Sequence, residues 1–437
     1  MLRSLAILMI VLASFPLIFM APHVGVLVWT WFSYMFPNRM MYGFATYFPF
    51  LDIVAVLTAL GWLFSREPKK LPLHPILLPF ILFVLWINIT TISSFHPDIS
   101  DLKLGNTMKA VIYTTFVYCL INTRHRIEAL LIVICASLGY LALKGAAFTI
   151  ATGGGHQVMG PMGTFIEDRN ALAMVLAMVI PLARYISLHA GSKVIRMLAL
   201  GLMLCCAVSI LGTQSRGGLL SLMVVGFWLI MMSRRRVSIL IACVIMGGFA
   251  ISFMPQSWKD RMSTIETYDQ DASAQGRLDM WRYAMELTED RPFTGGGFRI
   301  FTMRDVAAQY LPPGMWLRAS HSIYFEVLGE HGYVGLFLFI WLIATGLVTL
   351  QEVKRIARND TELIWARDLA QMGQASIVCF MVGGAFLEVA FAEIFLHLMA
   401  LSAILHRVVQ ADLASRTTVE RDRLTGALLT PTPQPAE

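Results

Sequence analysis

Residues 321–336, HSIYFEVLGEHGYVGL, open an apolar stretch that continues to residue 350 and begins on a histidine. The stretch exceeds the roughly 20 apolar residues that cross the hydrocarbon core of a bilayer as a helix. It therefore predicts a membrane-spanning helix with a titratable ring, His321, at one interface. The stretch therefore places the chain among membrane proteins.

The composition agrees with this class. Of the 437 residues, 57% are hydrophobic and only 14% are charged, with a mean hydropathy of +0.66, whereas a soluble domain has roughly 45–50% apolar and about 25% charged residues. Apolar runs lie at 3–36, 42–64, 72–95, 105–121, 127–150, 171–189, 197–213, 217–232, 237–254, 321–350, 367–388 and 390–406. The fold class we expect is an all-α polytopic membrane protein with about twelve transmembrane helices.

Basic clusters indicate the orientation. They lie on alternate connections: Arg66/Lys69/Lys70, Arg124/Arg126, Lys193/Arg196, Arg234/Arg235/Arg236 and Lys354/Arg355/Arg358. Because cytoplasmic loops carry an excess of Lys and Arg, all five are expected in the cytoplasm of a bacterium, with both termini there as well. Residues 1–36 then cross once, as two pieces broken around Pro16, Pro22 and Gly25. Such short clusters between apolar runs orient the chain in the bilayer and do not indicate a nucleic-acid partner.

This orientation divides the chain into four parts. Residues 1–254 and 321–406 form transmembrane helices, and residues 407–437 form a cytoplasmic tail without order. Residues 255–320 form a lid-like periplasmic segment. Its piece 276–289 has the pattern of an amphipathic helix, with apolar residues on one side, and Gly295–Gly297 follow it as a flexible turn. The apolar positions are Met280, Trp281, Ala284 and Leu287.

Among the ten histidines, the topology leaves His96, His156 and His321 at the periplasmic face. Only His321 lies between the polar segment and a helix. If Ser320 caps that helix, the positive helix start keeps the imidazole neutral, so that it accepts a proton near pH 7, and it also attracts an anion such as phosphate. The alternative is an interfacial histidine that only anchors the helix. Glu330 is nine residues further on and about 13.5 Å deeper, so it should pair with an adjacent helix and not orient His321.

Three arginines are expected at the same face. Arg169 immediately precedes a span, Arg216 lies at a tight turn and Arg277 opens the amphipathic helix. Guanidinium groups bind phosphate oxygens in pairs and stay charged, which suits a diphosphate. The alternatives are a solvated or ion-paired Arg277, and an Arg169 that is neutralised by the acidic residues before it.

The sequence does not predict a metal or another cofactor. Asp269 and Asp271 form an Asp-x-Asp pair that is too common to predict a metal site. All six cysteines fall in apolar runs and are expected to be buried thiols. Lys109 and Lys144 lie within expected spans, where an ionisable group is a functional candidate, and their roles stay open.

Several short motifs follow one another in a recognisable order. They are Ser215-Arg216-Gly217-Gly218-Leu219, Arg277 with Trp281, the Gly-Gly-Gly-Phe at 295–298, His321-Ser322-x-Tyr324, and Leu328-Gly329-Glu330-x-Gly332-x-x-Gly335. Over residues 160–400 the chain resembles the O-antigen ligase and polymerase superfamily, and it is similar to exosortase-associated O-glycosylation ligases.

The resemblance implies an activity. Such a ligase transfers a glycan from undecaprenyl diphosphate to lipid A–core oligosaccharide at the periplasmic face of the inner membrane, with inversion and without a metal. His321 matches the essential histidine of the family, and Arg216 and Arg277 match its donor-binding arginines; Arg169 aligns less closely. The alternatives are an O-antigen polymerase, a protein O-glycosylation ligase, or a transporter of the lipid-linked glycan. We find no internal repeat of the transporter kind.

Overall fold

The chain is almost entirely helical. The computed structural model describes residues 2–424 except 47, 234, 257, 260–271 and 313–314, and within these ranges it contains no strand. The helices are α1 (Leu2–Met20), α2 (His23–Met35), η1 (Pro37–Met40), η2 (Gly43–Thr46), α3 (Phe50–Phe64), α4 (Leu77–Ile92), α5 (Pro97–Leu120), α6 (Arg124–Ala151), α7 (Arg169–His189), α8 (Lys193–Gly212), α9 (Arg216–Met232), α10 (Arg236–Phe253), α12 (Ala272–Asp290), η4 (Ile300–Thr302), α13 (Arg304–Ala307), α14 (Ile323–Ile356), α15 (Ile364–Gly384) and α16 (Glu393–Leu424).

The helices are those of a membrane protein. Within the described ranges, α6, α7, α8, α14 and the part of α16 up to Thr418 are long and apolar enough to cross a bilayer. Shorter apolar helices lie in α1, α3, α4, α9 and α10. The expectation of an all-helical membrane protein is therefore confirmed, while the count of about twelve spans stays a prediction.

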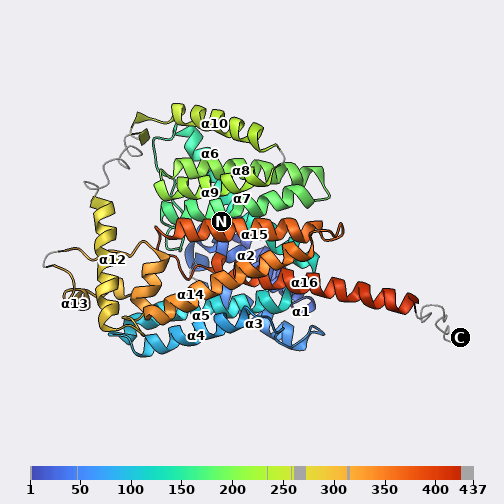
Figure 1. The fold of residues 1–437 in the computed structure, drawn as a ribbon, viewed down its shortest axis with the longest axis horizontal. Coiled ribbons are helices and arrows are strands. Elements are labelled where there is room, and N and C mark those ends of the chain that lie inside the picture. The colour runs from blue at the N-terminus through green and yellow to red at the C-terminus, as the bar shows by residue number, and fades with distance from the viewer. Residues whose placement is uncertain are drawn as a thin grey trace.

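The long helices lie side by side, and α12 stands across one end of them (Figure 1). The core of the bundle is α7, whose residues from Ala171 to Leu182 are buried on every side, and α6, α8, α9 and α15 pack around it. We call the end at which α7, α9 and α14 begin the His321 end. The opposite end, where α6 and α15 begin, is the basic end.

Ion pairs join several connections at the basic end. Arg126 donates to Glu67 at 2.5 Å, and the guanidinium of Arg124 lies 4.9 Å from the ring of Trp365. His189 contacts Asp368 at 2.9 Å. The connections that carry the first, second and third basic clusters therefore meet at one end of the bundle, as the positive-inside pattern predicts for a common side.

The first two helices form an antiparallel pair. At one end Ser4 Oγ accepts a hydrogen bond from the backbone of Tyr42 at 3.2 Å, and at the other Gly25 lies against Ile18. The start of α1 thus lies beside segment 37–46, which contacts the His321 end through Arg39 and Gly163 O at 3.3 Å.

This pair corrects one expectation. Residues 1–36 do not make a single crossing, because α2 runs back along α1. The predicted placement of both termini on one side is also wrong for the described residues, since α16 ends at the basic end, where Arg416 contacts Asp360 at 2.8 Å. Hydropathy alone cannot reveal a reversal of direction inside one continuous apolar run.

A break in α14 fixes the segment that follows α12. The helix is interrupted at Gly332, where φ is 68° and ψ is −171°. Segment 292–297 fills the break: Tyr333 N donates to Pro292 O at 2.8 Å, and Gly296 N donates to Gly329 O at 2.8 Å. These bonds satisfy backbone groups that the break releases. Gly295–Gly297 are buried and packed, so they form a docking turn and not the flexible one expected.

The substitution Gly332→Ala should destabilise the protein. The backbone there is open only to glycine, and an added Cβ would meet Pro292 O at 2.7 Å. We expect a loss of about 1–3 kcal/mol in the free energy of unfolding, seen as a lower melting temperature of the full chain in detergent. Gly226→Ala in α9 is the matched control, because an added Cβ there meets nothing within 4 Å. Equal melting temperatures for the two variants would refute the role of Gly332.

Candidate functional site

Two helices begin next to each other at the His321 end. Asp168 caps α7 by accepting from the backbone of Asn170 at 2.8 Å, and Ser215 caps α9 by accepting from Gly218 N at 2.9 Å. Both caps satisfy backbone groups that a helix start leaves open. Each cap is followed directly by an arginine, so two guanidinium groups are carried by two adjacent positive helix ends.

The two helix starts are joined by Arg169. Its guanidinium donates to the backbone oxygen of Gln214 at 3.3 Å. Gln214 adopts a left-handed backbone conformation with φ of 53°, which is uncommon for a residue other than glycine. Gly218 lies directly against Ala173 of α7, and a larger residue would separate the helices. The Ser-Arg-Gly-Gly motif therefore brings Arg169 and Arg216 to the same end of the bundle.

His321 lies just before α14 and not inside it. The helix begins at Ile323 with Ser322 in the cap position, so the expectation that Ser320 caps the helix is wrong. The backbone of His321 has φ of 47°. Such a conformation costs of order 1–3 kcal/mol and persists only where the surroundings impose it. His321 is held in a strained position by contacts to the residue before it in the sequence.

Those contacts are made to Ser320. Trp281 Nε1 donates to Ser320 O at 2.8 Å, and Ser320 N donates to a carboxylate oxygen of Glu388 at 2.8 Å. Ser320 is fully buried. Trp281 also stacks on Phe325 with ring centroids 4.8 Å apart. One side chain from α12 and one from the connection between α15 and α16 thus clamp the peptide units that precede His321.

The charges around His321 act on its pKa. Burial lowers the pKa of His321 below its usual value of 6.5, and the positive charge of Arg277 lowers it further. Glu388 and Asp168 act in the opposite direction, and Arg318 lowers the pKa slightly. The ring therefore stays neutral at pH 7, as expected from the sequence, but the first cause is burial and not the helix start.

The apolar face of α12 positions Arg277. Met280, Ala284 and Leu287 are fully buried against α14 and the segment after α12, and Thr288 Oγ1 donates to Leu328 O at 3.3 Å. Arg277 and Trp281 are four residues apart and so lie on one side of the helix. The structure thus brings all four expected site residues to one end, with Arg277 close enough to act on His321.

A buried charge cluster lies beside the clamp. Lys103 of α5 donates to Glu326 at 2.8 Å and to Glu330 at 2.7 Å. Glu326 also accepts from the backbone of Ala390 at 2.9 Å, and Glu330 accepts from Arg299 N at 2.8 Å. The expectation that Glu330 pairs with an adjacent helix is confirmed, and Glu330 does not orient His321.

The same cluster contains the group of carboxylates that could hold a metal ion. Among the described residues, Glu326, Glu330 and Glu388 offer oxygen atoms within 4.8 Å of one another. The ammonium group of Lys103 already supplies a positive charge to two of the three. Asp269 and Asp271 lie outside the described residues, and the absence of a metal requirement stays a prediction.

Two residues that matter here, Glu388 and Lys103, are not among the site residues that the sequence predicts. Glu388 is the last residue of the apolar run 367–388, and Lys103 lies just before the run that begins at residue 105. An ionisable residue at such a position is costly unless it is paired, and this signal could have identified both. Their partners could not be found that way, because Ser320 lies 68 residues from Glu388 and Glu326 lies 223 residues from Lys103.

The fold and this site define a helical membrane protein with arginines and a half-buried histidine gathered at one end. Residues 200–340 match the family model described as O-antigen ligase. The match confirms the resemblance to the O-antigen ligase and polymerase superfamily, and it supports activity of that general type. Arg216, Arg277 and His321 lie inside the matched region.

A second match covers the first part of the chain. Residues 2–191 match a family of unknown function (DUF5935), and Arg169 lies in that region. No curated protein matches the chain. The two matched regions form one structure, because Lys103 of the first region pairs with Glu326 and Glu330 of the second, and α7 packs against α8 and α9.

Proposed function

We propose that the protein is an O-antigen ligase of the bacterial inner membrane that transfers a glycan from undecaprenyl diphosphate to lipid A–core oligosaccharide. The observation that carries this proposal is the strained, clamped His321 at the same end as Arg169, Arg216 and Arg277. Its helices cross the membrane with the basic end of the bundle in the cytoplasm. Segment 255–320 and the His321 end then face the periplasm.

The chemistry is a single displacement. The acceptor hydroxyl gives its proton to the neutral imidazole of His321 as its oxygen bonds to the sugar carbon, and the bond from that carbon to the diphosphate breaks. The configuration of the carbon is inverted. Arg216 and Arg277, with Arg169 beside them, bind the diphosphate and stabilise the negative charge that builds on it, which is the work that Mg²⁺ does in other enzymes.

An assay with separate acceptors tests this function. The purified full chain is given the undecaprenyl-diphosphate-linked glycan with lipid A–core, with a second lipid-linked glycan, or with a protein acceptor, all in EDTA. We expect product on lipid A–core alone. Product on the lipid-linked glycan would instead indicate a polymerase, product on protein would indicate an O-glycosylation ligase, and movement of the donor without transfer would indicate a transporter. A requirement for Mg²⁺ would refute metal-independent transfer.

The pH profile gives a prediction about the base. The base must be neutral, so transfer is present above the pKa of His321 and is lost as the pH falls through it. Because Arg277 lowers this pKa, Arg277→Gln should move the acid limb to higher pH. Because Glu388 raises it, Glu388→Gln should move the limb to lower pH, while its amide oxygen still accepts from Ser320. The measurement is transfer rate against pH.

The surrounding charges of Asp168 and Arg318 stay in place in both variants. Arg277→Lys is the matched control, since it keeps the positive charge and should leave the acid limb where the wild type has it. If the acid limb moved in the same direction in Arg277→Gln and Glu388→Gln, or moved in neither, the assignment of His321 as the base would be contradicted.

A further inference from the structure

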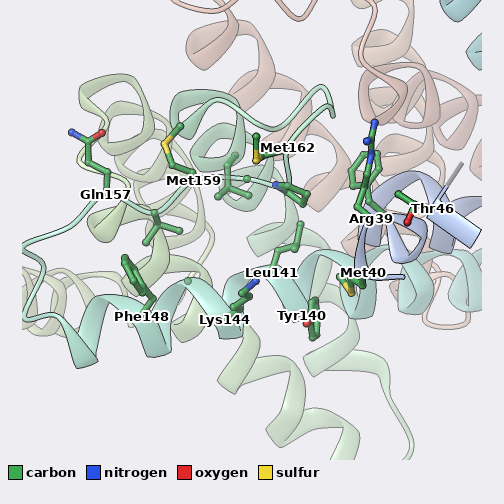
Figure 2. Close-up of a pocket in the computed structure, with 16 residues that line it drawn as sticks. Arg39, Met40, Thr46, Tyr140, Leu141, Lys144, Phe148, Gln157, Met159 and Met162 are labelled. Carbon is green, nitrogen blue, oxygen red and sulfur yellow. The ribbon is translucent and has the colours of Figure 1, made fainter. Parts of the chain in front are cut away.

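A cavity of about 700 Å³ lies apart from the residues that surround His321. Its walls come from α6, from the segment between α2 and α3, from the loop before α7 and from the first turn of α7. Among the described residues, none from α12, α14, α15 or α16 lines it. Figure 2 shows the 16 residues that line it, ten of them labelled. The cavity is therefore large enough for a ligand that binds away from the proposed glycan-transfer site around His321.

The lining combines apolar walls with positive charge. Tyr140 and Phe148 of α6 and Met159 of the loop are among its apolar members, and Arg39 and Lys144 are its two charged ones. Within the part of the chain that the structure describes, no carboxylate lines the cavity. A ligand that complements this lining has an apolar body and a negatively charged group.

Lys144 is the unusual member of this lining. It lies on α6, which is long and apolar enough to span a membrane, and it precedes the last residue of that helix by seven positions, or about 10 Å. Its neighbours Leu143 and Ile150 are 60% and 73% exposed, so this face of α6 is apolar and open. Among the described residues Lys144 has no ion pair, whereas Lys109 is paired with Asp52 at 3.0 Å.

Arg39, the second charged side chain of the lining, has N–H groups left to donate. Arg39 donates from one nitrogen to Gly163 O at 3.3 Å, and a guanidinium carries five N–H groups. In Figure 2 Lys144 lies between Tyr140 and Phe148 on the wall formed by α6, and Arg39 lies at the far side of the pocket. Guanidinium and ammonium groups both bind phosphate oxygens.

We propose that this cavity binds a phospholipid of the surrounding bilayer whose headgroup carries a net negative charge. Lys144 contacts the phosphate, Arg39 at the far side of the cavity adds a second positive charge to the lining, and an acyl chain lies along Tyr140, Phe148 and Met159. The bilayer is the source because the mouth is open and apolar: Met159 is 54% and Met162 is 78% exposed. An ionisable residue on an apolar face of a span is costly without such a partner.

Native mass spectrometry of the delipidated full chain tests this proposal. Dioleoyl phosphatidylglycerol, dioleoyl phosphatidylcholine and undecaprenyl phosphate are titrated separately, and the first is expected to bind most tightly. Lys144→Gln should weaken phosphatidylglycerol binding about fivefold, and Lys144→Gln with Arg39→Gln about thirtyfold, since each cation near a lipid surface contributes a similar factor. Lys109→Gln is the matched control and should bind as the wild type does.

Three results would overturn the proposal. One is equal binding of phosphatidylglycerol and phosphatidylcholine, which would remove the charge selectivity. The second is wild-type affinity in Lys144→Gln, which is an exposed side chain whose loss leaves the fold intact. The third is tighter binding of undecaprenyl phosphate than of phosphatidylglycerol, which would make the cavity a site for a substrate lipid. None of these results depends on glycan transfer, so the test is independent of the proposed function.

Discussion

His321→Asn is expected to lower the rate of glycan transfer by about 10²–10⁴-fold, the usual contribution of a general base. Asparagine removes the imidazole but tolerates the left-handed backbone better than most residues, so the strained φ of 47° at this position can be kept. The measurement is the rate of transfer of the lipid-linked glycan to lipid A–core by the purified full chain, with melting temperature as the check of folding.

His156→Asn is the matched control for this prediction. His156 is an exposed histidine in the loop before α7, at the same end of the bundle, and its substitution should leave the rate within twofold of the wild type, or about 0.4 kcal/mol. If folded His321→Asn transferred glycan at the wild-type rate, His321 would be the interfacial anchor that the sequence also allowed, and another group would have to accept the proton.

Lys103→Met should cause the largest loss of stability. The ammonium group lies between two carboxylates that are 2% and 0% exposed. Removing one partner of a buried ion pair leaves uncompensated charge and costs about 3–5 kcal/mol. We expect a large fall in the melting temperature of the full chain in detergent. Because Glu326 also binds the connection that carries Glu388, transfer activity should fall with it.

The same helix offers a control for Lys103. Lys109 pairs with Asp52, and both side chains are more than half exposed, so Lys109→Met should cost only about 0–1 kcal/mol. Lys103→Met combined with Glu330→Gln removes one of the two stranded charges and should regain part of the stability. Equal losses for the two single lysine variants would mean that the buried cluster does not hold the helices together.

Helix positions at the site were largely predictable. The expected spans began at residues 171 and 217, and the helices begin at Arg169 and Arg216. Hydropathy changes sharply where a polar loop meets an apolar run, and capping residues such as Asp168 and Ser215 stand directly before the helix. Arg169 and Arg216 could therefore be assigned to helix starts from neighbouring residues alone.

The surroundings of His321 were less predictable. The expected cap at Ser320 was two residues early, because Glu388 and Trp281 hold Ser320 outside the helix. The antiparallel course of α1 and α2 was also missed. Both features depend on contacts between residues that are distant in the chain. A hydropathy profile does not predict which segments are in contact.

The amino-acid sequence by itself determined that this is a helical membrane protein and that Arg169 and Arg216 are at the starts of their helices. These properties follow from local composition, since each apolar run must satisfy its own backbone hydrogen bonds to cross a bilayer. Only the tertiary structure decided the backbone strain at His321, its clamp by Glu388, the cluster around Lys103 and the cavity beside Lys144. Those features arise where charged and polar groups from separate helices are buried together, away from water, and must pair with one another.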